Sequence, residues 1–200
     1  MTGAPVLVAG VGNIFLGDDG FGVETVRRLS GVALPDGVEV VDVGVRGVDL
    51  AYRLLDGYRT AVLVDATCRG GPPGTLYLIE AAAEPLEVPA LDGHRMGPDA
   101  VLGLLATLAA GTGGEPPGRV LVVGCEPASL EEGIGLSEPV AAAVDGAVRM
   151  VLGAVEEAVR SGASSAEVSS PGASSAGVSS AGVSSADALS AESERRTTPC

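Results

Sequence analysis

The sequence VLVAGVGNIFLGDDGFG, at residues 6–22, contains the strand and the turn from which the rest of the fold follows. Its first six residues form an apolar run typical of a buried β-strand. The next segment, residues 21–32, places Val23, Val26 and Leu29 at helical spacing and predicts a helix that ends near Gly31. A strand, a glycine-rich turn and a helix in this order indicate the first unit of an α/β protein.

The glycine-rich turn does not fit a dinucleotide. A dinucleotide fingerprint needs a third glycine at its sixth position, where this chain has Phe15. Asp18 and Asp19 stand where a phosphate would approach, and their carboxylates would repel it. The turn therefore favours a cation, or acid/base chemistry.

Further apolar runs alternate with segments of helical period. The strand expected at 75–80 follows the strand at 60–67 after a turn too short for a helix, so we expect these two strands to form a hairpin, with 75–80 as an antiparallel edge strand. The fold class predicted is α/β, a three-layer sandwich in which helices cover both faces of a mostly parallel five-stranded sheet. The remaining predicted elements are strands at 38–43 and 119–126 and helices at 48–58, 98–110 and 137–161.

The chain divides by composition into two parts. Residues 1–161 predict one α/β domain. From Ser164 onward a five-residue period begins, SSAEV, SSPGA, SSAGV, with almost no large apolar side chains. Residues 162–200 are therefore predicted to be a disordered Ser/Ala/Gly-rich tail.

The composition limits the classes of partner. The 200 residues carry a formal charge of −14 and contain no lysine, and this acidity disfavours nucleic acid and anionic membranes. Three cysteines without a CxxC spacing indicate neither a disulfide framework nor a structural zinc site. With no export signal and no apolar stretch of about 18 residues, a cytoplasmic protein is expected.

Acidic residues follow most of the predicted parallel strands. The carboxyl ends of such strands meet at one edge of the sheet, where α/β proteins bind their ligands. We therefore expect the acids to line one rim. They are Asp18 and Asp19 after the first strand, Asp42 near the end of the second, Asp65 at the end of the third and Glu126 at the end of the fifth.

Several of these acids also have a purely structural interpretation. Asp18 is suited to cap the helix that starts near Gly20, and Asp65 could cap the turn that follows its strand. Asp19 is harder to explain structurally, because a second adjacent carboxylate adds repulsion that a cation or a proton would have to offset.

His94 is the only histidine and lies in the predicted loop before the helix at 98–110. A lone histidine is usually structural or solvated, but together with two aspartates it would suit zinc, nickel or manganese and leave coordination positions open. A nucleophilic pair of Cys68 and His94 is a further alternative. The GxSxG, HExxH and P-loop motifs are absent from the sequence.

Four separated segments together resemble the maturation endopeptidases of nickel-iron hydrogenases. They are GVGNIFLGDDGFG (10–22), LVDAT (63–67), HRMGPDAVL (94–102) and VVGCEPASLEEGIGLSEPV (122–140). The resemblance implies an endopeptidase that removes the C-terminal extension of the hydrogenase large-subunit precursor after nickel insertion and recognises the bound nickel. It implies a monomer whose partner is that precursor.

The resemblance also implies residue roles. Asp19, Asp65 and His94 would contact nickel supplied by the precursor, which zinc or cadmium can replace, and Asp19, Asp42 and His94 would be catalytic, with Asp42 the candidate base. The family usually has Asp-Gly-Gly-Thr where this chain has DVGV at 42–45. Two alternatives stay open, a non-proteolytic nickel-binding assembly factor and a nucleotide-dependent oxidoreductase.

Overall fold

The structure is a computed structural model, and it describes residues 6–81 and 97–167. The described part contains five strands, one short 3-10 turn (η1) and four helices. In chain order they are β1 (Val6–Val11), η1 (Gly17–Gly20), α1 (Phe21–Leu29), β2 (Val38–Gly44), α2 (Gly47–Arg53), β3 (Thr60–Ala66), β4 (Leu76–Ala81), α3 (Pro98–Thr112), β5 (Arg119–Cys125) and α4 (Glu138–Glu167).

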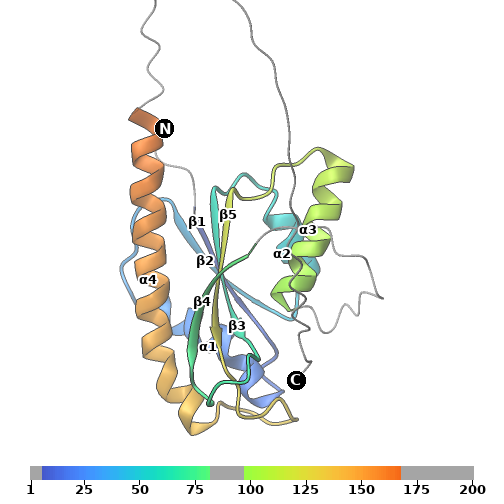
Figure 1. Cartoon of the computed structure of the whole chain (residues 1–200), viewed down its shortest axis with the longest axis vertical. Coiled ribbons are helices and arrows are strands. Elements are labelled where there is room, and N and C mark those ends of the chain that lie inside the picture. Colours follow the sequence, from blue (N-terminus) through green and yellow to red (C-terminus); the bar gives the residue numbers. More distant parts are fainter. Residues whose placement is uncertain (1–5, 82–96, 168–200) are drawn as a thin grey trace, which may run out of the picture.

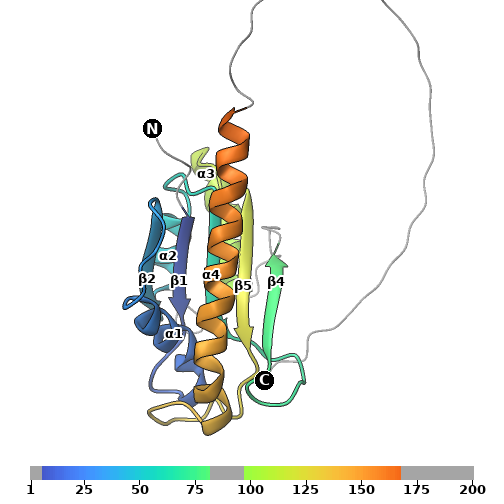
Figure 2. The ribbon, with the colours of Figure 1, turned by 90° about the vertical axis from the view of Figure 1, so that its left-hand side faces the viewer.

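The five strands form one sheet in the order β2-β1-β3-β5-β4. β1, β2, β3 and β5 are parallel, and β4 pairs antiparallel with β5 at the edge. Figure 2 shows β1 and β5 running in one direction and β4 in the other. The predicted mostly parallel sheet with an antiparallel edge strand is confirmed. The predicted hairpin is wrong, because β5 lies between β3 and β4 and is the antiparallel partner of β4.

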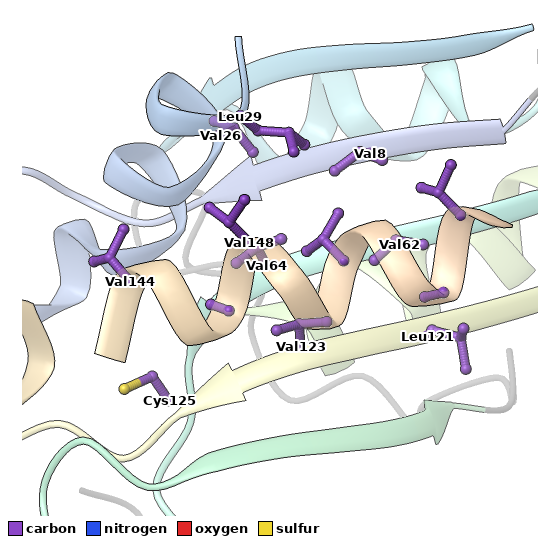
Figure 3. Close-up of a cluster of buried hydrophobic side chains, with 14 of the residues drawn as sticks. Val8, Val26, Leu29, Val62, Val64, Leu121, Val123, Cys125, Val144 and Val148 are labelled. Carbon is purple, nitrogen blue, oxygen red and sulfur yellow. The ribbon is translucent and has the colours of Figure 1, made fainter. Parts of the chain in front are cut away.

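Helices cover both faces of the sheet and give three layers (Figure 1). Alternate residues of the central strands point to opposite faces. Val8, Val62 and Val64 therefore pack under α1 and α4 (Figure 3), whereas Leu7 and Leu63 belong to the second core, under α2 and α3. β1 and β3 are buried along nearly their whole length, as expected of central parallel strands.

Two glycines let α1 approach the sheet closely. A Cβ atom on Gly22 would overlap the carbonyl oxygens of Val11 and Val64, and one on Gly10 would collide with the Gly22 backbone. Gly22 thus allows the close helix–strand packing for which a dinucleotide fold uses the third glycine of its fingerprint. Phe15, which holds that fingerprint position here, is 62% exposed instead.

The predicted bounds agree with the structure to within a few residues, except at two helix ends. α2 ends at Arg53, five residues before the predicted end, and α4 runs to Glu167, six residues beyond it. The predicted disorder of the tail from residue 162 is wrong for residues 162–167, because they continue α4. Residues 168–200 lie outside the described part, so their predicted disorder stays a prediction. None of the helices in the described part is long and apolar enough to cross a bilayer.

Candidate active site at the carboxyl edge of the sheet

Two loops meet below the carboxyl ends of the parallel strands, residues 12–20 after β1 and residues 126–137 after β5 (Figure 2). Backbone hydrogen bonds join them, from Gly17 N–H to the Gly133 carbonyl (3.0 Å) and from Gly133 N–H to the Phe15 carbonyl (2.9 Å). The five acids predicted to line the rim lie on these loops or at the adjacent strand ends, but their surroundings differ.

Asp18 holds the two loops together. Its buried carboxylate accepts backbone hydrogen bonds from Ala128 (2.8 Å), Ser129 (3.2 Å) and Ser137 (2.6 Å), and one from the Ser137 hydroxyl (2.9 Å). Burial alone would raise the pKa of Asp18, but these hydrogen bonds outweigh it and lower the pKa. Asp18 is therefore a structural carboxylate.

The prediction that Asp18 caps α1 is wrong. The residue before α1 is Gly20, and no side chain caps that end. Asp18 lies inside the short turn η1 (Gly17–Gly20), so its side chain reaches the loop after β5 instead of the first amides of the helix. Asp18 thus accepts hydrogen bonds from backbone amides more than 100 residues away in the sequence, such as that of Ala128, and not from the first amides of α1.

Glu126 has a similar structural role on the next turn. Its carboxylate accepts hydrogen bonds from the amides of Arg69 (2.8 Å) and Gly70 (3.0 Å) and from the Tyr77 hydroxyl (2.8 Å). Burial opposes ionisation, but the Arg69 amide and the Tyr77 hydroxyl contribute most to a net lowering of the Glu126 pKa. Glu126 fixes the turn between β3 and β4.

Asp42 lies at the rim but on the other face of the sheet from Asp65. In the strand register Asp42 pairs with Gly10, and Gly10 pairs with Val64, so Asp42 shares a face with Val64 while the next residue, Asp65, points to the opposite face. Asp42 is exposed, and its carboxylate lies 3.6 Å from the Arg27 guanidinium on α1. The structure thus does not bring Asp42 and Asp65 together.

Asp65 and Asp19 do come together, on either side of Gly12. A Cβ atom on Gly12, whose φ is +123°, would overlap the Asp19 carbonyl oxygen and stand 3.6 Å from Asp65 Oδ1. Asp19 Oδ2 accepts one hydrogen bond, from the Asn13 amide (2.6 Å), which orients the carboxylate. Within residues 6–81 and 97–162, no basic side chain pairs with Asp19 or Asp65.

The surroundings of Asp65 disfavour its charged form. Burial, followed by repulsion from Asp19 and Asp99, raises the pKa of Asp65 well above its ordinary range, and a hydrogen bond with the Ala66 amide offsets only part of this. A carboxylate that is 5% exposed and repelled by a second carboxylate gains stability from a proton or from a cation. Hydrogen bonds thus stabilise the charged forms of Asp18 and Glu126, whereas the surroundings of Asp65 disfavour its charged form.

A divalent ion would need more than these two carboxylates. The described residues contain no group of three or more His, Cys, Asp or Glu side chains placed to hold a metal. His94 lies outside the described residues, so its predicted role stays a prediction. It precedes Gly97 by three residues in the sequence, and a Cβ atom on Gly97 would stand 3.8 Å from Asp65 Oδ2.

Two further side-chain groups bear on the sequence predictions. Cys125 is buried, and burial raises the pKa of its thiol to about 11, so it is an inert core residue. The alternative pair of Cys68 and His94 involves a residue outside the described part. Of the two valines that replace family residues, Val43 is buried under α2 and Val45 is 48% exposed at the rim.

Comparison with known proteins shows to which family the chain belongs. A family model described as hydrogenase maturation protease matches residues 23–154. The chain belongs to the hydrogenase maturation protease family. It is 36% identical over 154 residues to the hydrogenase 2 maturation protease of Escherichia coli, a match that covers 76% of this chain and 91% of that protein.

Two further similar proteins agree with this assignment. The chain is 35% identical over 162 residues to the hydrogenase expression/formation protein HoxM of Cupriavidus necator, covering 79% of this chain and 72% of HoxM. The solved structure of the hydrogenase maturating endopeptidase HybD from E. coli superposes with a TM-score of 0.63 at 35% identity, covering 76% of this chain and 93% of HybD.

The family assignment makes this protein a peptidase, and hence a hydrolase. It confirms the resemblance inferred from the four sequence segments. It also argues against both alternatives, the non-proteolytic assembly factor and the nucleotide-dependent oxidoreductase.

Two structural features that shape this site could not be read, or were not read, from the sequence. Asp18 and Asp19 are adjacent, and only the folded chain shows that Asp18 accepts hydrogen bonds from Ser129 and Ser137. The role of Gly22 had a signal in the sequence, because it is the third glycine of the GDDGFG segment and lies near the start of the first helix, where that helix contacts the sheet.

Proposed function

We propose that this protein removes the C-terminal extension of a nickel-iron hydrogenase large-subunit precursor once nickel has been inserted. It recognises the precursor's nickel through Asp19, Asp65 and His94. Nickel belongs to the substrate in this proposal, and zinc or cadmium can take its place. The protein acts as a cytoplasmic monomer.

One observation carries the proposal: Asp65 is a buried carboxylate beside Asp19 with no cationic partner among the described residues. Such a pair is costly to the folded protein unless something positive binds there. Carboxylate oxygens with one imidazole suit nickel and leave coordination positions for ligands from the precursor. The unfavourable energy of the two carboxylates in the free protein therefore favours binding of the precursor's nickel.

The two carboxylates would act mainly by positioning. If the precursor's nickel sits against Asp19 and Asp65, the scissile peptide bond near it is held in one place, and water can attack its carbonyl carbon. The carbon–nitrogen bond then breaks, and the leaving amine takes up a proton. Asp42 remains a candidate base, but its ion pair with Arg27 and its place on the other face of the sheet support that role less well.

The test is a mass measurement of the precursor after incubation with the intact protein. We expect the nickel-loaded precursor to lose its extension and the nickel-free precursor to stay intact. Asp19→Asn, Asp65→Asn and His94→Ala should each slow the cleavage at least about 100-fold, since even residues that only orient metal ligands typically contribute 10–100-fold.

The matched control is Asp36→Asn, an exposed aspartate just before β2, at the opposite edge of the sheet. Its cleavage rate should equal that of the wild type. Equal cleavage of loaded and nickel-free precursor would refute nickel recognition, and normal rates in all three site variants would refute the site.

A further inference from the structure

The joined loops at the carboxyl edge display two large apolar side chains to solvent. Ile134 is 84% exposed and Phe15 is 62% exposed, the highest values among the exposed large hydrophobic side chains of the described part. They lie on adjacent segments, because Leu16 and Gly133 form a parallel bridge between the two loops. We call Phe15, Ile134 and the backbone that joins them the apolar tip.

The backbone under the apolar tip is held firmly. The bridge is closed by hydrogen bonds from Gly17 N–H and Gly133 N–H, and Asp18 N–H donates to the Ser129 carbonyl (3.1 Å). The Asp18 carboxylate adds four more hydrogen bonds to the same loop. Exposed apolar side chains on a preorganised backbone lose little conformational entropy on binding, which is a property of interface anchors.

The apolar tip is continuous with the candidate active site. Asp18 anchors the tip, and the carbonyl oxygen of the next residue, Asp19, lies with Asp65 Oδ1 around Gly12. A polypeptide whose scissile bond lies at Asp19 and Asp65 would therefore run close to the tip. This continuity points to the substrate as the occupant.

The charge around the tip indicates which side chains a bound segment of the substrate would carry. Residues 127–138 contain three glutamates and no basic residue. Glu131 and Glu132 are both exposed, and neither forms an ion pair with any described residue. Unpaired surface carboxylates next to an apolar anchor favour a segment with apolar and basic side chains close together.

We propose that the apolar tip is the docking surface for a segment of the hydrogenase precursor in which an apolar residue is flanked by Lys or Arg. Phe15 and Ile134 bury the apolar residue, and Glu131 and Glu132 face the basic ones. The tip acts by binding and positions the precursor for cleavage at Asp19 and Asp65. The identity of this partner rests on the proposed function, whereas the surface itself does not.

The test measures binding and cleavage separately. The Phe15→Ser/Ile134→Ser double variant should bind purified nickel-loaded precursor at least tenfold more weakly, and the precursor concentration for half-maximal cleavage should rise by the same factor. The rate at saturating precursor should change less than twofold. The single substitution Phe15→Leu should keep most of the wild-type affinity, because leucine is also apolar.

The matched control is Leu78→Ser, which removes an apolar side chain of similar exposure (52%) from β4. It should leave binding unchanged, and the melting temperatures of all these variants should match the wild type because the altered side chains are exposed. The Glu131→Gln/Glu132→Gln variant should bind more weakly at low salt and lose most of the salt dependence of binding.

Normal binding by the double variant would overturn the docking proposal whatever the cleavage result. Failure of the wild type to cleave a precursor that it binds through the tip would instead refute the proposed function. Sedimentation supplies the remaining outcome: a wild-type dimer that the double variant dissociates would make the tip a self-association surface and overturn the proposal.

Discussion

Asp18 and Asp65 lie at the same edge of the sheet, and both are almost fully buried, yet their surroundings are opposite. Asp18 accepts four hydrogen bonds that lower its pKa, whereas burial, followed by repulsion from Asp19, raises the pKa of Asp65. Burial opposes the charged form of both carboxylates, most strongly that of Asp65, and only Asp18 has enough hydrogen-bond donors to outweigh it. The comparison separates a carboxylate whose charge the fold stabilises from one whose charge the fold disfavours.

The largest expected effect comes from Asp65→Asn, which keeps the shape of the side chain and removes its charge. Cleavage of nickel-loaded precursor should fall at least about 100-fold. The melting temperature should stay equal or rise, because the substitution also removes the repulsion with Asp19. A melting temperature several degrees below the wild type would show that Asp65 is structural and would erase the contrast with Asp18.

Asp18→Ala should have the reverse signature. It leaves four donors near Ala128, Ser129 and Ser137 without their acceptor, and the free energy of unfolding should fall by about 3 kcal/mol. Chemical denaturation would measure this. A loss of cleavage without a loss of stability would place Asp18 in the chemistry instead.

The same carboxylate makes a prediction about pH. Because the folded-state pKa of Asp18 is lowered, its contribution to stability is complete above the ordinary value of 3.8 and is lost as the pH falls below it. Asp18→Asn should therefore flatten the decline in stability below about pH 4. A decline as steep as in the wild type would assign the acid sensitivity to other groups.

Glu126→Gln should have a smaller effect of the same kind. An amide can keep part of the contact with the Arg69 amide and the Tyr77 hydroxyl, so the free energy of unfolding should fall by about 1–2 kcal/mol. Cleavage at saturating precursor should remain near the wild-type rate, as determined by mass measurement. A much larger loss of cleavage would show that Glu126 does more than stabilise the turn between β3 and β4.

The smallest effect is expected from Asp42→Asn. The side chain is exposed and its ion pair with Arg27 is a surface one, so stability should change by less than about 0.5 kcal/mol. The register places it on the other face from Asp65, and cleavage should fall by less than threefold. A loss as large as that of Asp65→Asn would establish Asp42 as the base.

Most of the fold could be predicted from the sequence because its signals are local. The apolar runs of β1 and β3 mark central strands. The short turn before β4 indicates an antiparallel edge strand but not its partner, because β5, far away in the sequence, inserts between β3 and β4. The end of α2 was missed, since its periodicity continues into Leu54 and Leu55 although the helix stops at Arg53.

The site could be predicted only in part, because the role of an acid depends on distant residues. Strand ends placed Asp19 and Asp65 at one rim, and the structure brings them together around Gly12. The same rule also placed Asp18, Asp42 and Glu126 there, and nothing near them in the sequence indicates their donors or their face of the sheet. Ser137 donates to Asp18 and Arg69 donates to Glu126, and the register of three strands decides the face on which Asp42 lies.

The most direct test of the central claim is the affinity of the wild type and of Asp65→Asn for the nickel-loaded and the nickel-free precursor, measured as one cycle. If Asp65 meets the precursor's nickel, the wild type binds the loaded form at least tenfold more tightly, and the variant binds both forms equally. A preference for the loaded form that survives unchanged in Asp65→Asn would contradict the account.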